Sequence, residues 1–225
     1  EPLLRPDLHE LISRLSVTGL EVALTTNASL LPQQAAKLAE AGLDRVTVSL
    51  DALDPEVHSQ MSDSNIPVGT VLDGIEAALE AGLTPLKVNC VVQRGVNETE
   101  VVPLVRHFRG TGVTVRFIEY MDVGRTNGWQ LGQVVPSADI LTHLQGEFDL
   151  VSVESQRPSD VARRWAHSDG SGEIGFISSV SEPFCGGCVR ARLSADGMLH
   201  TCLFASGGHD LRAIIHNGTE GPALS

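Results

Sequence analysis

The segment Ala39–Leu43, with the sequence AEAGL, recurs almost unchanged as LEAGL at Leu79–Leu83. In both copies an apolar helical pattern ends at the glycine, and a β-branched strand pattern follows within a few residues. The order of strand, loop, helix, glycine and strand is that of the βαβ unit. Its repetition predicts a parallel sheet with helices outside it.

Hydrophobic periodicity predicts four strands in the first part of the chain, with helices between them. A closed barrel of βα units has eight strands, so the chain contains either part of a barrel or an open sheet, and both remain open on this pattern. The expected strands cover residues 21–24, 45–50, 86–92 and 113–120, and expected helices begin near residues 7, 32, 54, 68, 97 and 137.

Polar residues gather near the points where these strands meet loops, which is where parallel α/β sheets carry their chemistry. Lys87 and Asn89 share one strand face, because side chains alternate with a period of two. A lysine inside a strand predicts that this face lines a polar cavity rather than packing against helices. Ordinary capping or edge residues would give a similar pattern. The residues concerned are Thr25, Thr26, Asn27, Ser49, Asp51, Lys87, Asn89, Arg116 and Glu119.

The composition changes after about residue 148. Glycine, serine and charged residues dominate residues 154–173, and only the stretches 174–177 and 191–199 have strand-like patterns. We therefore expect two domains: an α/β domain over residues 1–148 and a smaller, loop-rich region over residues 149–225.

Three of the four cysteines, Cys185, Cys188 and Cys202, form a C-x2-C-x13-C pattern. Two thiolates on a glycine-rich turn can hold one metal centre, and the turn signal at 194–197 predicts a hairpin that returns the third cysteine. A disulfide framework is not expected, because three is an odd number and nothing indicates secretion. Cys90 lies in an apolar strand and is expected to be a buried small side chain.

The cysteine spacing alone fits two kinds of metal centre. Zinc binds four ligands, and His200 or His209 could complete a Cys3His set. An iron–sulfur cluster held by three cysteines would leave one iron open to another ligand, such as a substrate. Arg190 and Arg192, on one face of the expected strand, are typical of a phosphate clamp, although two solvated surface arginines would give the same pattern.

The charge balance excludes several kinds of partner. The chain has 28 acidic residues against 16 Lys and Arg, a net charge of -12, and an aromatic fraction of 4%. A protein that binds a nucleic-acid backbone needs the opposite balance, so no nucleic-acid partner is expected. No run of about 18 apolar residues occurs, so no membrane span is expected either. An anionic ligand would need a local cluster of cations.

Several segments resemble, in order and over nearly the whole chain, the GTP 3′,8-cyclase branch of the radical S-adenosylmethionine (SAM) superfamily. The Arg-x-Arg that begins two residues after the second cysteine of C-x2-C-x13-C is specific to that branch, which serves molybdenum cofactor biosynthesis. Glu1-Pro2 resembles the end of a Gly-Gly-Glu-Pro motif that holds the SAM amino group. The matching segments are EPLLR at 1–5, LTTN at 24–27, VSLD at 48–51, KVN at 87–89, RFIEYMD at 116–122 and FCGGCVRARL at 184–193.

The resemblance implies an α/β fold, a partial (incomplete) TIM-like barrel of six βα units with a C-terminal iron–sulfur appendage. It also implies SAM and two [4Fe–4S] clusters as cofactors, the first of which cleaves SAM to a 5′-deoxyadenosyl radical. That radical takes the 3′ hydrogen of GTP, and the sugar radical then attacks C8 of guanine to give 3′,8-cyclo-7,8-dihydro-GTP. The second cluster leaves one iron free to contact the guanine.

The resemblance further assigns roles to residues of this chain. The SAM-contacting positions correspond to Ser49 and Met121. The GTP-contacting positions correspond to Thr25, Lys87, Arg190, Ala191 and Arg192, and Arg116 matches a basic residue near the triphosphate. The ligands of the second [4Fe–4S] cluster correspond to Cys185, Cys188 and Cys202.

The C-x3-C-x2-C motif that holds the SAM cluster in this family has no counterpart in the sequence, which starts downstream of it. We therefore expect a piece of a longer enzyme, a radical SAM lyase, that does not cleave SAM by itself. The implied partners are GTP, an electron donor and the synthase that makes cyclic pyranopterin monophosphate from the product, and a homodimer is compatible with the family. The absence of a leader segment predicts a cytoplasmic location.

Two other hypotheses compete with this one. A peptide-modifying radical SAM enzyme with an auxiliary-cluster domain would usually carry more than three cysteines in that domain. A non-catalytic α/β scaffold with a structural Cys3His zinc site would be colourless and contain zinc rather than iron. The identity of the bound metal separates this last hypothesis from the cyclase.

Overall fold

The computed structural model describes residues 1–122, 128–154, 160–205 and 207–216. The chain divides into two compact units. The first comprises Glu1–Met121 and Gln130–Pro183, and the second comprises Asp122–Trp129 and Phe184–Ser225. Among the described residues, no helix has the length and apolar character needed to cross a membrane.

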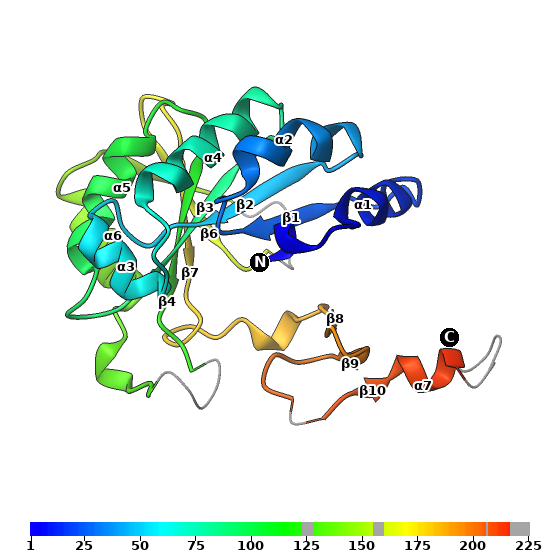
Figure 1. Ribbon diagram of the computed structural model, residues 1–225. Coiled ribbons are helices and arrows are strands. Elements are labelled where there is room, and N and C mark those ends of the chain that lie inside the picture. Colours follow the sequence, from blue (N-terminus) through cyan, green and yellow to red (C-terminus); the bar gives the residue numbers. More distant parts are fainter. Residues whose placement is uncertain (123–127, 155–159, 206, 217–225) are drawn as a thin grey trace. The chain divides into compact units, whose positions relative to one another are not determined.

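A seven-stranded sheet forms the centre of the first unit, in the order β1-β2-β3-β4-β7-β6-β5 (Figure 1). The first five strands in this order, β1 to β7, run parallel to one another. Strand β6 then pairs antiparallel with β7, and β5 pairs antiparallel with β6. The α/β fold with a mostly parallel sheet is therefore confirmed. The strands are β1 (Ala23–Thr26), β2 (Arg45–Ser49), β3 (Lys87–Val92), β4 (Thr114–Glu119), β5 (Leu150–Val153), β6 (Arg163–His167) and β7 (Glu173–Ile177).

Helices connect the parallel strands and cover one face of the sheet (Figure 1). The two AEAGL-type repeats end two of these helices, α2 and α4, as predicted. Gly42 and Gly82 have φ angles of 92° and 75°, a left-handed conformation that glycine adopts without strain. The α-helices are α1 (Leu8–Ser16), α2 (Leu31–Glu40), α3 (Pro55–Ser62), α4 (Val68–Glu80), α5 (Val101–Phe108) and α6 (Ser137–Gln145), and the 3₁₀ helices are Pro2–Leu4, Glu98–Glu100 and Leu131–Gln133.

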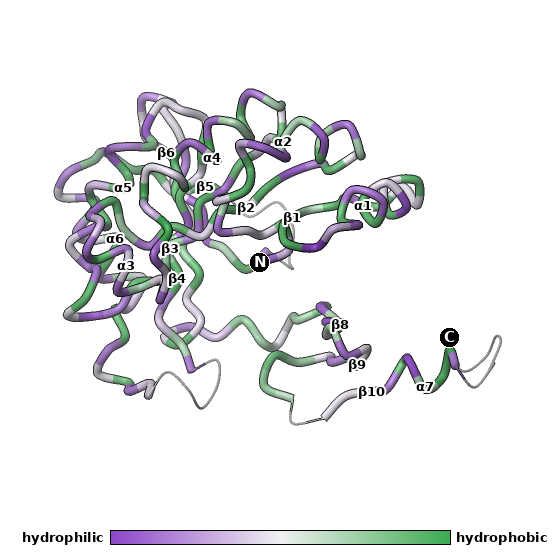
Figure 2. Tube along the Cα trace, in the orientation of Figure 1, coloured by the Kyte–Doolittle hydropathy of each residue, from purple (hydrophilic) through white to green (hydrophobic). Residues whose placement is uncertain are grey.

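The hydrophobic core lies between these helices and the sheet. Alternate residues of β3 are buried, and hydrophobic and hydrophilic positions alternate along the strands of the sheet (Figure 2). The alternation leaves a polar face on the other side of the sheet. Core residues on the strands include Val46, Val48, Val88, Cys90, Val92, Val115 and Phe117.

The boundary between the two units differs from the domain boundary expected at residue 148. Strands β5, β6 and β7, at residues 150–177, extend the main sheet instead of forming part of a separate region. The composition of this stretch is polar because β5 and β6 are short strands at one end of the sheet, with several exposed or half-buried side chains. Composition alone therefore assigned them to the wrong unit.

The second unit is small and contains a three-stranded antiparallel sheet in the order β10-β9-β8. The predicted hairpin is present, since β8 and β9 pair on either side of the turn at residues 194–197. The elements are the 3₁₀ helix Cys185–Gly187, β8 (Arg192–Leu193), β9 (Met198–His200), β10 (His209–Asp210) and α7 (Leu211–His216).

Candidate functional site

The face of the main sheet opposite the helices carries polar side chains in two rows that cross neighbouring strands. Lys87 and Asn89 both lie on this face, as the period of two predicted, and each is half-buried. The register of the parallel strands sets the rows. One row is Thr25, Thr47 and Lys87, and the next is Ser49, Asn89 and Arg116.

Arg116 connects the two rows through its guanidinium group. Its Nε donates a hydrogen bond of 2.8 Å to Oδ1 of Asn89, and a terminal nitrogen donates to Oγ1 of Thr47 at 3.5 Å. The aliphatic stem lies against Gly175, the register partner of Arg116 on β7. A Cβ at that position would lie 2.9 Å from Cγ of Arg116, so a larger residue would displace the stem.

Two other arginines on the same face are neutralised by carboxylates. Arg45 forms an ion pair with Glu21 at 2.7 Å. Arg164 is held by both carboxylate oxygens of Glu173, with a shortest distance of 2.7 Å. These bidentate pairs leave little positive charge for a ligand.

Lys87 and Arg116 differ from those two arginines, because neither forms an ion pair with any carboxylate in the described part of the chain. Burial lowers the pKa of Lys87, and the nearby charges of Arg116, Arg45 and Arg164 lower it further, although the charge of Glu21 acts in the opposite direction. Burial also lowers the pKa of Arg116, with a smaller effect of Arg45 in the same direction. A bound anion would relieve both effects, so this pair of cations has the electrostatics of an anion site.

The positions of these two cations along their strands differ from the expectation that they would lie where strands end. Lys87 is the first residue of β3, and Arg116 is the third residue of β4. On this face Lys87 and Asn89 are followed by Val91, and Thr114 and Arg116 are followed by Ile118, so the polar part of the face lies in the amino half of these two strands. The cations occupy the amino half of that face.

The carboxyl end of the sheet carries a second group of polar residues around Glu1. The Glu1 carboxylate accepts hydrogen bonds from Oγ1 of Thr26 at 2.7 Å and from the amide of Asn27 at 2.8 Å. Ser49 ends β2 and is exposed, and Met121 lies two residues after the end of β4. The two predicted SAM-contacting residues thus both lie at the carboxyl ends of parallel strands.

Two carboxylates organise the loops at this end. Asp51 accepts the Val91 amide at 2.7 Å, and burial raises its pKa to about 6 although that hydrogen bond opposes the shift. Glu119 is fully buried, and its oxygens accept the amides of Ser137, Val180 and Ser181 and the Ser181 hydroxyl. Burial alone would raise the pKa of Glu119, but these donors together hold it below its usual value.

Sequence reasoning missed several residues of this network. Asn97 was expected only to begin a helix, but its side chain is buried. Its Nδ2 donates hydrogen bonds to the carbonyl oxygens of Asp51 and Val91, at 2.9 and 2.8 Å. Glu100 likewise accepts the amides of Leu53 and Asp54. The partners lie more than 40 positions away for Asp51, Leu53 and Asp54, so no local pattern could reveal them.

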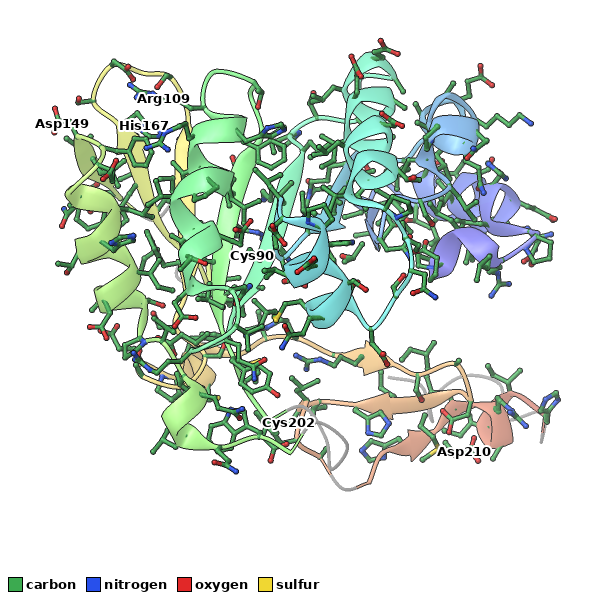
Figure 3. The ribbon with its side chains drawn as sticks, turned by 60° about the vertical axis from the view of Figure 1, so that its left-hand side comes forward. Cys90, Arg109, Asp149, His167, Cys202 and Asp210 are labelled. Atoms are coloured by element: carbon green, nitrogen blue, oxygen red, sulfur yellow. The ribbon has the colours of Figure 1, made fainter. Side chains whose placement is uncertain are left out.

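The second unit holds the three cysteines of the C-x2-C-x13-C pattern, all exposed and free (Figure 3 labels Cys202). Cys185 and Cys188 lie at the two ends of one 3₁₀ turn, where the amide of Cys188 donates to the carbonyl of Cys185 at 3.2 Å. The backbone of Arg190 lowers the pKa of the Cys188 thiol, and the charges of Arg190 and Arg192 act in the same direction. Cys90, in contrast, is buried in the main sheet as predicted.

Arg190 and Arg192 differ in their surroundings. Arg190 lies before β8, with its guanidinium carbon 4.8 Å from the centre of the Phe184 ring. Arg192 belongs to β8, and one of its guanidinium nitrogens is buried without a hydrogen-bond partner among the described residues. Ala191 is exposed between them. The two arginines therefore do not share one strand, contrary to the expectation.

The donor set suits a soft metal centre, because three free thiols, one with a lowered pKa, are available as thiolates. In the ranges that the structure describes, no three His, Cys, Asp or Glu side chains are gathered closely enough to hold a metal ion. His200, one of the two candidate fourth zinc ligands, has its Nδ1 3.2 Å from the carbonyl oxygen of Gly207. The three thiols are donors of the kind that hold an iron–sulfur cluster. Their positions in this structure are too far apart to bind one metal centre together.

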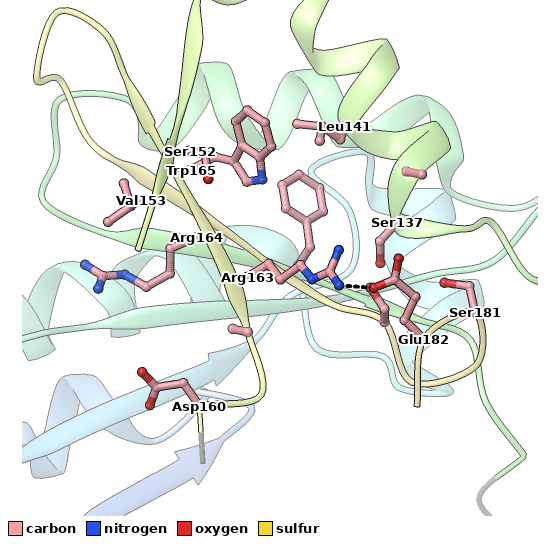
Figure 4. Close-up of a pocket in the computed structure, with 14 residues that line it drawn as sticks. Ser137, Leu141, Ser152, Val153, Asp160, Arg163, Arg164, Trp165, Ser181 and Glu182 are labelled. Carbon is pink, nitrogen blue, oxygen red and sulfur yellow. Dashed lines mark ion pairs between the residues drawn. The ribbon is translucent and has the colours of Figure 1, made fainter. Parts of the chain in front are cut away.

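A cavity of about 430 Å³ lies elsewhere in the first unit, on the helix side of β5 and β6 (Figure 4). Trp165 and Leu141 provide apolar walls, and the lining includes an ion pair between Arg163 and Glu182. None of the residues predicted to contact SAM, GTP or a cluster lines this cavity.

Two family models match the chain. The Radical SAM superfamily matches residues 1–108, and Molybdenum Cofactor Synthesis C matches residues 113–225. Their junction falls just before β4. Together they cover almost the whole chain.

Curated relatives are similar over the full length of the chain. The GTP 3′,8-cyclase of Xanthomonas axonopodis pv. citri (strain 306) is 55% identical over 100% of the chain and 67% of its own length. Those of Acidothermus cellulolyticus and Staphylococcus carnosus are 47% and 41% identical over 100% of the chain, which covers 62% and 66% of their lengths. The chain therefore spans about two thirds of these relatives.

A solved structure supports the fold. A domain of pyruvate-formate lyase-activating enzyme from Bacteroides vulgatus matches 64% of this chain and 84% of that domain, with a TM-score of 0.50 and 20% sequence identity. At that identity the likeness concerns the fold alone. The family models and the curated relatives carry the assignment. The resemblance deduced from the motifs is thereby confirmed, and the chain belongs to the GTP 3′,8-cyclase family of radical SAM enzymes, which acts in molybdenum cofactor biosynthesis.

Proposed function

We propose that this chain provides the substrate-binding and second-cluster parts of a GTP 3′,8-cyclase. In the complete enzyme, GTP and SAM would be converted to 3′,8-cyclo-7,8-dihydro-GTP, the first step of molybdenum cofactor biosynthesis. The names of the relatives support GTP as the substrate, and membership of the radical SAM superfamily implies SAM and a [4Fe–4S] cluster.

The observation that carries the proposal is that Lys87 and Arg116 form no ion pair with a carboxylate among the described residues. A triphosphate carries several negative charges and would be held there by charge-assisted hydrogen bonds from both side chains. Thr25 lies in the same row as Lys87 and can donate a further hydrogen bond to the nucleotide. In an acidic protein with a net charge of -12, two neighbouring cations that form no ion pair among the described residues attract an anion to this face.

Ser49 and Met121 are proposed to contact SAM at the carboxyl end of the sheet, where ligands of parallel α/β folds bind. The exposed end of β2 at Ser49 supports this assignment. A partial barrel is proposed as the finer description of the sheet. The electron donor, the downstream synthase and a homodimer belong to the same proposal as functions of the complete enzyme.

Cys185, Cys188 and Cys202 are proposed to hold the second [4Fe–4S] cluster, and Arg190, Ala191 and Arg192 to contact GTP beside it. When bound, such a cluster offers one iron without a cysteine ligand, to which an atom of the substrate can coordinate. The lowered pKa of Cys188 favours the thiolate that a metal requires. Four free cysteines also accord with a reducing compartment such as the cytoplasm.

Calorimetric titration of this chain with GTP and with guanosine tests the proposal. GTP should bind at least about tenfold more tightly than guanosine, because the phosphates supply the charge-assisted contacts. Its affinity should fall as salt is raised from about 0.05 to 0.5 M. Equal affinity for both ligands, or no binding of GTP, would reject the proposed triphosphate site.

A further inference from the structure

Among the residues that the structure describes, the guanidinium group of Arg116 is held by neutral side chains alone. Asn89 accepts from Nε at 2.8 Å and Thr47 accepts from a terminal nitrogen at 3.5 Å. A guanidinium has five N–H donors, so these contacts fix its orientation and leave donors for a ligand. Asn89 is the register partner of Arg116 on the adjacent strand, so the contact is built into the sheet.

The other arginine in this row shows what an acidic partner does. Arg164 is also the register partner of Gly175, on the opposite side of β7. Its guanidinium is paired with both oxygens of Glu173, at distances from 2.7 to 3.0 Å. Such a pair satisfies the donors and cancels the charge. Asparagine has the shape of aspartate without its charge. Asn89 can therefore orient the guanidinium group of Arg116 without neutralising its positive charge.

Because Arg116 is partly buried, its energy depends strongly on whether residue 89 is neutral or acidic. Burial lowers the pKa of Arg116, which reflects the cost of keeping a charge there without compensation. An acidic residue at position 89 would remove that cost, yet the position holds asparagine. Gly175 also restricts the side chain of Arg116, because the space beside this glycine just accommodates the aliphatic stem. The arrangement orients a cation and leaves it available to an anion.

We infer that Asn89 is a positioning residue that presents the uncompensated guanidinium of Arg116 to the phosphates of the nucleotide. The inference rests on the proposed GTP-binding function and adds to it the residue that sets the direction and the charge of Arg116. Asn89 acts through Arg116 and needs no contact with the nucleotide.

Titration of this chain with inorganic triphosphate tests the inference, using Asn89→Asp and Asn89→Ala. Asn89→Asp keeps the acceptor for Nε and adds one negative charge, so its affinity should fall by about 10- to 100-fold. Asn89→Ala loses the orientation and keeps the positive charge, so its affinity should fall by about three- to tenfold. Asn65→Asp, at an exposed position, adds the same charge elsewhere and should change the affinity less than about twofold.

The readouts separate a positioning role from a structural one. Guanosine affinity of Asn89→Asp should match that of the wild-type chain, and its urea midpoint should not fall, because the added carboxylate offsets the cost of the buried guanidinium. Wild-type affinity in Asn89→Asp, or a larger loss in Asn89→Ala than in Asn89→Asp, would overturn the inference. Arg116→Ala separates a failure of the inference about Asn89 from a failure of the proposed GTP site. If Arg116→Ala weakens triphosphate binding while Asn89→Asp does not, the GTP site stands and the inference fails. If Arg116→Ala has no effect, both are rejected.

Discussion

Oδ1 of Asp51 accepts the backbone N–H of Val91 at 2.7 Å and thereby joins the loop after β2 to the end of β3. The carbonyl of Asp51 is bonded in turn by the side chain of Asn97 at 2.9 Å. These two contacts fix the carboxyl ends of adjacent strands next to Ser49. They also place an ionisable group in a largely buried position, which gives the stability of the chain a defined pH dependence.

The first prediction concerns Asp51, whose pKa burial raises from 3.8 to about 6. Because the folded-state pKa lies above the unfolded value, the protonated form favours folding. That contribution is complete below pH 3.8 and is lost as the pH rises through about 6. Asp51→Asn removes the buried charge and should stabilise the chain at pH 8 by about 1 to 3 kcal/mol, with little gain at pH 4.

Urea unfolding of both proteins at pH 4, 6 and 8 measures this difference. Asp54→Asn offers a comparison that removes a helix-capping carboxylate from an exposed position and should not stabilise the chain at any of these pH values. A stability of Asp51→Asn below that of the wild type at pH 8 would show that the Asp51 charge is favourable and that the assignment is wrong.

The second prediction concerns Glu119, the fully buried acceptor of three amides and one hydroxyl. Glu119→Ala leaves these donors without partners and should cost about 3 to 5 kcal/mol in the free energy of unfolding. Glu10→Ala removes a carboxylate from an exposed i,i+4 pair with Arg14 and should cost less than about 0.5 kcal/mol. Denaturant midpoints at pH 7 compare the two, and a loss below about 1 kcal/mol for Glu119→Ala would contradict the role of this carboxylate.

The third prediction concerns cysteine reactivity. Cys188 is exposed, and Arg190 lowers its pKa, whereas burial raises the pKa of Cys90 well above 9.0. Brief treatment of the native chain with iodoacetamide at pH 7 should therefore label Cys188 and leave Cys90 unlabelled, as read by peptide mass spectrometry. Arg190→Ala should slow the labelling of Cys188 by about two- to fivefold, and Arg14→Ala, in the other unit, should not change it. An unchanged labelling rate in Arg190→Ala would show that Arg190 does not lower the pKa of the Cys188 thiol.

The fourth prediction concerns the second cluster. After anaerobic reconstitution, the chain should contain about four iron and four sulfide and absorb broadly in the visible range. Cys188→Ser should lose most of the iron, whereas Cys90→Ser should retain it because Cys90 is buried in the core. Zinc uptake without iron would instead support the structural zinc site.

The order of elements could be predicted from the sequence because the AEAGL repeat is local: the glycine and the strand that follows it are only a few residues apart. The placement of Lys87 and Asn89 on one face followed from the period of two, which needs no tertiary information. The family followed from motifs that are specific to it. In each case the signal lies within a short segment of chain.

The remaining features depend on distant residues. The sequence does not show that Arg45 and Arg164 are paired with carboxylates, whereas Lys87 and Arg116 form no such pair within the described ranges. Glu119 meets donors 18 to 62 positions away, so its buried role leaves no local pattern. The antiparallel strands β5 and β6 were assigned to the second domain because their polar composition resembles that of a loop.

The affinity of this chain for GTP, measured by calorimetry in the wild type, Lys87→Ala, Arg116→Ala and Arg45→Ala, tests the central claim most directly. Lys87→Ala and Arg116→Ala should each weaken binding by about 10- to 100-fold, because each removes a cation that has no carboxylate partner in the described residues. Arg45→Ala, which removes a cation already paired with Glu21, should change the affinity by less than about threefold. Equal losses in all three variants, or none in Lys87→Ala and Arg116→Ala, would contradict the assignment of the triphosphate to these two cations.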